Sequence, residues 1–323
     1  MRAVRPYLSI EYLSICPNLK AKWLEFNDMA AVIIDGKKIS DEIKVELKIE
    51  IQKLREKDII PGIAAVLVGS NPASALYVKM KAKACEKVGI YSEVINRDDN
   101  FPHSDMEKLV KDLNDRDDID GILVQSPLPE QIDEPAITML IDPKKDVDGF
   151  HPVNQGLLLA GHPRFEPATP MGIVEMLERS GHHASGKNVV VLGRGFLVGR
   201  PLSVMLSTKT ARTNATVTIC HTGTPNISDY TRKADIIVAA MGRARFLKGD
   251  MVKPGAVVID VGTNQIEDPS HPKGKRLVGD VDFDSVSKVA GAVSPVPGGV
   301  GPMTIAALLT NTLKACKMKH DLI

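Results

Sequence analysis

The sequence is poor in several features that mark whole classes of protein. Its four cysteines are scattered and form no CxxC pair, which fits free thiols in a reducing compartment and argues against a zinc or iron–sulfur site. The eight histidines show no HExxH-like spacing, and no transmembrane stretch is present. Aromatic residues make up 4% of the chain and the net charge is +1. We therefore expect no metal, no nucleic-acid partner and no membrane partner.

Residues 1–28 differ in composition from the rest of the chain. They hold the single tryptophan, Trp23, and mixed charge, with no continuous apolar segment and no small-residue cleavage pattern. A secretory signal is therefore not expected. An organelle transit peptide is the alternative, although Glu11, Glu25 and Asp28 count against it. We treat residues 1–28 as a leader of uncertain role and expect a cytoplasmic location, or an organellar one if the leader is a transit peptide.

From residue 30 onward, strand-like and helix-like segments alternate, which predicts βα units on mainly parallel sheets. The first half shows apolar strands at 31–36, 62–69, 90–96 and 121–125, separated by helices at 38–57, 72–89 and 104–115. A Gly- and Pro-rich stretch from Asp142 to Pro170 follows, which we interpret as the crossing between two domains. A second series of strands lies near 188–192, 215–220, 235–240 and 256–261. The fold class is therefore α/β with two domains, in agreement with a length of 323 residues.

One lysine in the first half stands on the wrong face of its helix. At about 100° per residue, Lys81 falls away from the lysines of the solvated face and onto the apolar stripe. The solvated face holds Lys79, Lys83 and Lys87, and the apolar stripe holds Tyr77, Ala84, Cys85 and Val88. Burial disfavours the charged form of a lysine and lowers its pKa, which turns the amine into a base. The alternative is a snorkelling lysine at the edge of a core.

A glycine-rich turn opens the second half. The strand 188–192 runs into Gly193-Arg194-Gly195-Phe196-Leu197-Val198-Gly199, before a predicted helix. Glycines there let the backbone approach a pyrophosphate at a helix N-terminus, although a tight structural turn is the alternative. The next strand ends at His221-Thr222-Gly223-Thr224, without the acidic residue that holds a ribose 2′-hydroxyl. Arg194 and the two threonines suit a 2′-phosphate instead, which predicts NADP as the cofactor, with NAD possible.

The Tyr77-x-x-x-Lys81 spacing is also found in short-chain dehydrogenases. In those enzymes the glycine turn precedes the tyrosine and lysine within one domain, whereas here the order is reversed. Ligands of parallel sheets bind beyond the carboxyl ends of the strands. The strands before Ser70 and Gln125 end at such positions, so we expect Tyr77, Lys81 and Gln125 to meet in a cleft between the domains.

Several ordered motifs together carry a family resemblance. They are Tyr77-Val78-x-x-Lys81-x-Lys83-Ala84-Cys85, Gly121-Ile122-Leu123-Val124-Gln125-x-Pro127-Leu128-Pro129, Lys145-Asp146-Val147-Asp148-Gly149, Asp260-Val261-Gly262-x-Asn264, Gly279-Asp280-Val281, and the run from Pro295 to Thr304. Over residues 29–320, the chain resembles the bifunctional methylenetetrahydrofolate dehydrogenase/cyclohydrolase family.

The sequence also departs from the usual pattern of that family. Gly195 stands where serine is usual in the glycine turn, which weakens the expected grip on a 2′-phosphate. Ser126 replaces leucine, Thr263 replaces isoleucine, and Ala168 replaces cysteine. Residues 207–214 also form a longer segment than in the common bacterial form.

The resemblance implies a division of labour along the chain. Residues 29–150 with 296–323 would form the folate-binding catalytic domain, and residues 151–295 an NAD(P)-binding Rossmann-like domain. The implied catalytic residues are Lys81, Tyr77, Gln125 and Asp148, and the implied substrate contacts add Pro297, Gly298 and Gly299. The implied cofactor contacts are Gly193, Arg194, Gly195, Gly199, Thr222 and Thr263. A homodimer formed through the nucleotide domains is also implied.

The implied function is a pair of reactions in one-carbon metabolism, which supplies purine biosynthesis. The first oxidises 5,10-methylenetetrahydrofolate to 5,10-methenyltetrahydrofolate with NADP, and the second hydrolyses that product to 10-formyltetrahydrofolate. One alternative is an NAD-dependent dehydrogenase of the same family with weak or no cyclohydrolase activity. Another is a nucleotide-sensing module that kept only the fold. Such a module would be expected to lose Lys81 or Asp148, and both are present.

Overall fold

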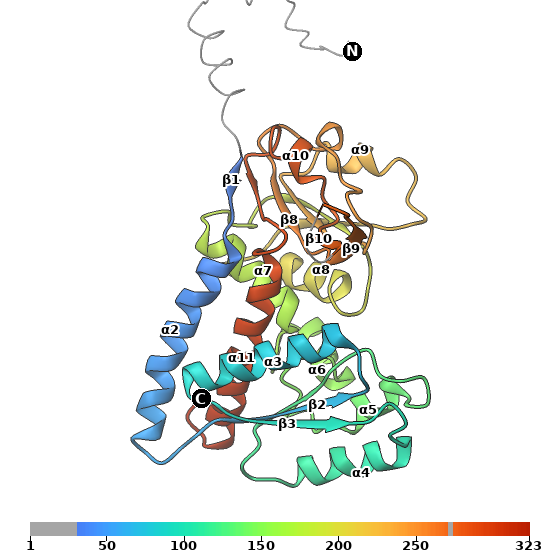
Figure 1. Ribbon diagram of the computed structural model, residues 1–323. Coiled ribbons are helices and arrows are strands. Elements are labelled where there is room, and N and C mark those ends of the chain that lie inside the picture. Colours follow the sequence, from blue (N-terminus) through green and yellow to red (C-terminus); the bar gives the residue numbers. More distant parts are fainter. Residues whose placement is uncertain (1–30, 271–273) are drawn as a thin grey trace, which may run out of the picture.

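The computed structural model describes residues 31–270 and 274–323, so the leader predicted at 1–28 lies outside the described residues. Figure 1 shows two lobes joined by two long helices that run side by side, α2 (Gly36–Arg55) and α11 (Val300–Lys319). We call the lobe built on the three-stranded sheet the first lobe, and the lobe built on the six-stranded sheet the second lobe. Both sheets are parallel, as the alternation of strands and helices predicts.

The first lobe is centred on one fully buried strand. This strand, β2 (Gly62–Val68), has the sequence GIAAVLV and pairs with β3 (Tyr91–Arg97) on one side and β4 (Gly121–Val124) on the other. An unbroken apolar run is expected where helices cover both faces of a parallel sheet. The helices of this lobe are α3 (Pro72–Val88), α4 (His103–Asn114) and α5 (Glu134–Leu140).

The second lobe has the strand order β1-β11-β8-β7-β5-β6. The bounds are β1 (Val32–Ile33), β11 (Ala292–Val293), β8 (Val257–Asp260), β7 (Ile236–Ala239), β5 (Asn188–Leu192) and β6 (Thr216–Cys220). An antiparallel pair, β9 (Asn264–Glu267) and β10 (Lys275–Val278), follows β8. The short helices are α8 (Gly199–Ser207), α9 (Ile227–Thr231), η2 (Gly249–Met251) and α10 (Phe283–Val286).

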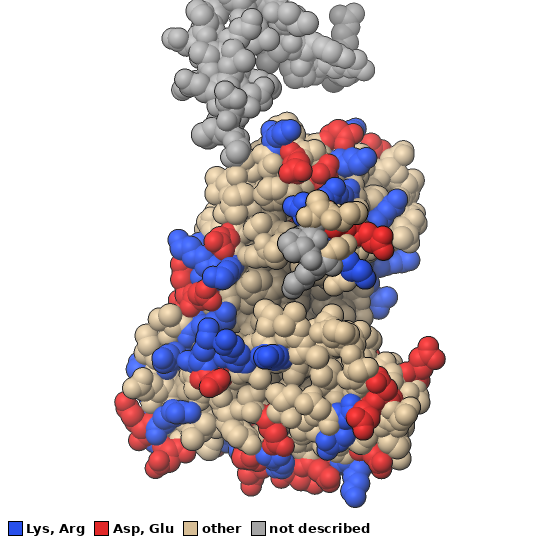
Figure 2. Space-filling model, viewed as in Figure 1, with Lys and Arg blue, Asp and Glu red and all other residues tan. Residues whose placement is uncertain are grey.

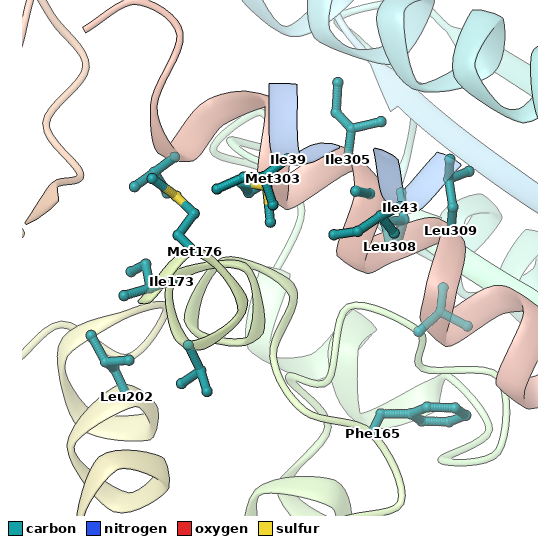
Figure 3. Packing of buried hydrophobic residues seen from close by; sticks show 14 of the residues in the cluster. Ile39, Ile43, Phe165, Ile173, Met176, Leu202, Met303, Ile305, Leu308 and Leu309 are labelled. Atoms are coloured by element: carbon teal, nitrogen blue, oxygen red, sulfur yellow. The ribbon is translucent and has the colours of Figure 1, made fainter. Parts of the chain in front are cut away.

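Apolar side chains from three helices fuse the two lobes into one core. Figure 3 shows Ile39 and Ile43 of α2 against Ile305, Leu308 and Leu309 of α11, with side chains of α7 (Ala168–Arg179) close by. The residues labelled from α7 are Ile173 and Met176. Because α11 contacts both α2 and α7, the C-terminal helix helps to hold the two lobes together.

The structure corrects one expectation about this fold. The first strand is only two residues long and pairs with β11 in the second lobe, although we expected it to begin the first half. Its apolar run fits either sheet, and the pairing is decided by backbone bonds such as that from Ile34 N to Val293 O, 3.0 Å. The stretch from Asp142 to Pro170, which we interpret as the crossing between two domains, contains α6 (Pro152–Leu159) and the start of α7.

Removing apolar volume from α11 should destabilise the whole molecule. Leu308 is 0% exposed, so Leu308→Ala leaves a cavity and is expected to cost about 2–5 kcal/mol. Thermal unfolding should register this as a clear fall in Tm, at roughly 2–4 °C per kcal/mol in large domains. Val45→Ala on α2 is the control, because Val45 is 62% exposed and should change stability by less than about 0.5 kcal/mol. Equal Tm changes in the two variants would contradict the role of α11.

Candidate active site

Local sequence fixes the helix that carries Lys81. The side chain of Asn71 accepts hydrogen bonds from the backbone N–H of Ala73 (2.9 Å) and Ser74 (3.2 Å), which satisfies two donors at the start of α3. Gly89 ends the helix in the left-handed conformation. Lys79, Lys83 and Lys87 are exposed and Lys81 is buried, as the helical periodicity predicts. Figure 2 shows Lys and Arg side chains gathered over this helix, below a hollow between the two lobes.

The Lys81 amine contacts a polar side chain and an aromatic ring. The residue is only 5% exposed, and its Nζ donates a hydrogen bond to Oε1 of Gln125 at 3.2 Å. The same nitrogen lies 4.8 Å from the centre of the Tyr77 ring. Burial lowers the pKa of Lys81, while the nearby carboxylate of Asp148 acts in the opposite direction. A buried amine with a lowered pKa is the property that a lysine base requires.

Gln125 is held so that its oxygen faces the amine. It directly follows β4, and its backbone N–H donates to Val66 O at 2.9 Å. Its side-chain Nε2 donates to Ser126 O at 2.7 Å, which leaves Oε1 for Lys81. The hydroxyl of Ser126 donates a hydrogen bond to the carboxylate of Glu134.

The segment that carries Asp148 is anchored on both sides. Lys145 Nζ donates to three carbonyls at the end of α4, those of Leu113, Asn114 and Arg116, at 3.2, 2.7 and 2.6 Å. A lysine in this position satisfies carbonyls that a helix end leaves unpaired. Lys145 in the Lys-Asp-Val-Asp-Gly motif therefore has a structural contact rather than a position in the cleft.

On the other side, the Asp146 carboxylate accepts hydrogen bonds from the backbone N–H of Phe150 (3.1 Å) and His151 (2.8 Å). Burial raises the pKa of Asp146 to about 6, against the effect of its donors. Asp148 therefore lies in the short segment between Lys145 and His151, and it is half-buried. Burial raises the pKa of Asp148, and Lys81 opposes that shift. The two groups act on each other without forming a salt bridge within the described part of the chain.

Tyr77 connects this cluster to the start of α11. Its hydroxyl donates to Gly301 O at 3.5 Å, and burial raises its pKa. The predicted substrate contacts Pro297, Gly298 and Gly299 lie directly before this point, and Gly298 O accepts a hydrogen bond from the start of α2 at 2.9 Å. Lys81 thus contacts both Tyr77 and Gln125 directly. Asp148 lies close enough to affect the pKa of Lys81. Residues 297–299 lie at the adjoining end of α11.

The glycine turn of the second lobe packs closely against the loop that follows β7. At Gly193, φ is +117°, and an added Cβ would lie 2.1 Å from Ala240 O, so a side chain there is excluded. Gly195 faces open space and Arg194 is exposed, while Gly199 begins α8. Backbone N–H groups and a free guanidinium beside a helix N-terminus therefore fit a dinucleotide with a 2′-phosphate.

The remaining predicted cofactor contacts lie at the same edge of the sheet. Thr222 is exposed beyond the end of β6, next to the glycine turn, and Thr263 is exposed beyond the end of β8. The hydroxyl of Thr224 accepts a hydrogen bond from His221 N at 2.9 Å, so that threonine stabilises its own loop. The rings of Phe150 and Phe196 lie 5.9 Å apart between centres and connect the Asp148 segment to the glycine turn.

Sequence reasoning missed the two buried carboxylates behind this edge, Asp260 and Asp280. Both lie in motifs that carried the family resemblance, but residue type alone gives no sign of their hydrogen bonds. Among the described residues, no group of three or more His, Cys, Asp or Glu could hold a metal ion. Over the same residues, no helix has the length and apolarity needed to cross a membrane.

The chain matches a known family in both halves. Residues 34–148 match "Tetrahydrofolate dehydrogenase/cyclohydrolase, catalytic domain", and residues 167–320 match "Tetrahydrofolate dehydrogenase/cyclohydrolase, NAD(P)-binding domain". A relative from Chlorobium phaeovibrioides, called "Bifunctional protein FolD", is 52% identical over 294 residues, which cover 90% of this chain and 100% of the relative.

Solved structures agree with this match. The bifunctional enzyme FolD from Campylobacter jejuni superposes with a TM-score of 0.84 at 46% identity, covering 90% of this chain and 100% of that one. The Trypanosoma brucei methylenetetrahydrofolate dehydrogenase-cyclohydrolase was solved with NADP cofactor and an inhibitor. It superposes with a TM-score of 0.85 at 40% identity, covering 90% of this chain and 99% of that one. This chain therefore belongs to the bifunctional tetrahydrofolate dehydrogenase/cyclohydrolase family.

Proposed function

We propose that this chain oxidises 5,10-methylenetetrahydrofolate to 5,10-methenyltetrahydrofolate with NADP and then hydrolyses the product to 10-formyltetrahydrofolate, with Lys81 serving the hydrolysis. One observation carries the assignment of Lys81. Lys81 is almost fully buried, yet its amine is hydrogen-bonded to Gln125 and lies 4.8 Å from the centre of the Tyr77 ring.

A neutral Lys81 suits both steps. Removal of a hydride leaves positive charge at the reacting carbon, and a protonated lysine nearby would oppose that charge. Burial lowers the pKa of Lys81 and so favours the neutral amine. In the second step the amine takes a proton from the attacking water while the water oxygen bonds to the methenyl carbon. The hydroxyl proton of this adduct then passes to N5 as the bond between N5 and the carbon breaks, which leaves the formyl group on N10. The Lys81 amine releases its proton to solvent.

The neighbouring side chains would position the folate. The Asp148 carboxylate can accept two parallel hydrogen bonds from the pterin amino group and ring N–H, a charge-assisted contact. Tyr77 can stack on the aminobenzoyl ring, and Pro297, Gly298 and Gly299 would border the same ligand. Gln125 holds the Lys81 amine by the hydrogen bond at 3.2 Å.

The second lobe would hold the cofactor. When bound, NADP accepts the hydride from the folate. Gly195 faces open space where its pyrophosphate would lie, while Gly193 and Gly199 let the turn pack closely against neighbouring backbone. Arg194 and Thr222 are exposed at the edge where a 2′-phosphate would bind. Thr263 would contact the cofactor from the end of β8. The missing serine hydroxyl at Gly195 removes one contact, so Arg194 carries most of the preference for NADP.

The wider biological setting is part of the same proposal. We place the enzyme in the cytoplasm, where its product supplies one-carbon units for purine synthesis. We also propose a homodimer formed through the second lobe. Among the described residues, β6 is the edge strand of the sheet and presents Ile219, which is 39% exposed. The proposed catalytic domain is 29–150 with 296–323 and the cofactor domain is 151–295, with β1 contributed to the sheet of the cofactor domain.

Replacing Lys81 should remove the proposed base and leave the rest of α3 unchanged. Lys81→Met should reduce hydrolysis of the methenyl substrate by roughly 10²–10⁴-fold, because the base is lost. Loss of methenyl absorbance, corrected for the uncatalysed rate, measures this. Lys83→Met is the matched control, since Lys83 lies on the exposed face of the same helix and its loss should leave the rate unchanged. Near-wild-type hydrolysis in the Lys81 variant would refute the assignment.

The cofactor preference should depend on Arg194. A charge-assisted contact to phosphate contributes roughly 1.5–3 kcal/mol, which is about one to two decades in affinity. Arg194→Ala should therefore lower the ratio of kcat/KM for NADP to that for NAD by a factor in that range. Steady-state rates with each cofactor give the ratio. A parent enzyme that prefers NAD, or an NADP preference that survives the substitution, would disprove the role of Arg194.

A further inference from the structure

Two buried carboxylates lie directly behind the cofactor edge of the second lobe. Asp260 at the end of β8 is 3% exposed and Asp280 after β10 is 0% exposed. Within residues 31–270 and 274–323, neither carboxylate forms a salt bridge with a lysine, arginine or histidine. Buried charge without a cation is costly, so these groups must be stabilised by hydrogen bonds alone.

Asp280 receives four such bonds from two separate loops. Its Oδ2 accepts from the backbone N–H of Met241 (2.6 Å) and Gly242 (2.9 Å), and its Oδ1 accepts from the N–H of Arg243 (2.8 Å). Its Oδ1 also accepts from Nδ2 of Asn264 at 2.8 Å. One side chain therefore fixes the loop that follows β7 and the loop that follows β8.

Asp260 fixes Asp280 in turn. Its Oδ1 accepts from the backbone N–H of Gly262 and of Asp280, both at 2.9 Å, and its Oδ2 accepts from Val281 N–H at 3.1 Å. The packing is so close that an added Cβ at Gly262 would lie 2.2 Å from Asp280 N. The two carboxylates thus form one hydrogen-bonded unit with the three surrounding loops.

The position of these loops points to one half of the cofactor. Thr222 follows β6, on one side of the glycine turn of β5, whereas the loops held by Asp280 follow β7 and β8, on the other side. In dinucleotide-binding sheets the adenosine ribose is held at the tip of the strand next to the glycine turn. The loops at 241–243 and 262–264 therefore border the half of the dinucleotide that ends in nicotinamide.

We propose that Asp280 is a positioning residue for NADP, which holds the loops at 241–243 and 262–264 in the arrangement that receives the nicotinamide half. This inference rests on the proposed function. A carboxylate is required because three backbone N–H groups and one amide N–H converge on its two oxygens. An asparagine would present its own NH₂ to N–H donors on one side and leave the loops unrestrained.

The test uses Asp280→Asn in the full-length enzyme. The dissociation constant of NADP, measured by calorimetric titration without folate, should rise at least tenfold, and KM for NADP should rise with it. At saturating NADP, kcat should stay within about threefold. Hydrolysis of supplied methenyltetrahydrofolate in the absence of NADP should stay within twofold, because that step needs no dinucleotide. Asp284→Asn is the control, since Asp284 is exposed on the adjoining α10 and should change none of these values.

Two results with the Asp280 variant would overturn the inference. One is an unchanged dissociation constant for NADP in the Asp280 variant, and the other is an equal loss of NADP binding and methenyl hydrolysis, which indicates a general structural role. If Asp280→Asn does not fold, Asn264→Ala removes one of the four donors and should still weaken NADP binding severalfold. An unchanged constant there would also overturn the inference. Failure of the parent enzyme itself to bind NADP would refute the proposed function instead.

Discussion

The hydrogen bond between the Lys81 amine and Gln125 Oε1 draws together parts of the chain that are distant in sequence. Lys81 comes from α3 and Gln125 from the end of β4, while Asp148 belongs to a segment anchored separately by Lys145 and Asp146. The backbone fixes where these side chains lie, because the cap at the start of α3 positions the helix and the parallel pairing of β2 with β4 positions the strand. The chemistry of the first lobe therefore depends on how its sheet and helices pack.

Holding an amine out of water has a cost in stability that depends on pH. The unfolded chain keeps a proton on Lys81 up to the ordinary lysine pKa of 10.5, whereas burial lowers the pKa in the folded enzyme. Between those two pKa values the unfolded state binds more protons, so the Lys81 contribution to stability rises as pH rises through that window. Below the lowered pKa the folded state carries the full cost of a buried ammonium. A functional group that opposes stability at neutral pH is expected at an active site.

Sequence reasoning succeeded where the signal is local and periodic. Helical spacing alone places Lys81 on the buried face of α3, and the strand–turn–helix pattern identifies the glycine turn at Gly193. It failed where the deciding interaction joins distant backbone groups. The two residues of β1 fit either sheet by composition, and only their bonds to β11 assign them to the second lobe. Three of the four donors that converge on Asp280 are backbone N–H groups, and these cannot be identified from residue type.

To serve as the base, Lys81 must lose its proton more easily than an ordinary lysine, whose pKa is 10.5. Titration of the enzyme labelled with ¹³C-lysine, followed by NMR of the Cε resonances, tests this directly. The Lys81 signal is assigned by its absence in the Lys81→Met variant. Burial lowers the pKa of Lys81, so its signal should titrate at a lower pH than the ordinary lysine pKa of 10.5. Titration of Lys81 at or above that ordinary value would contradict its role as a base.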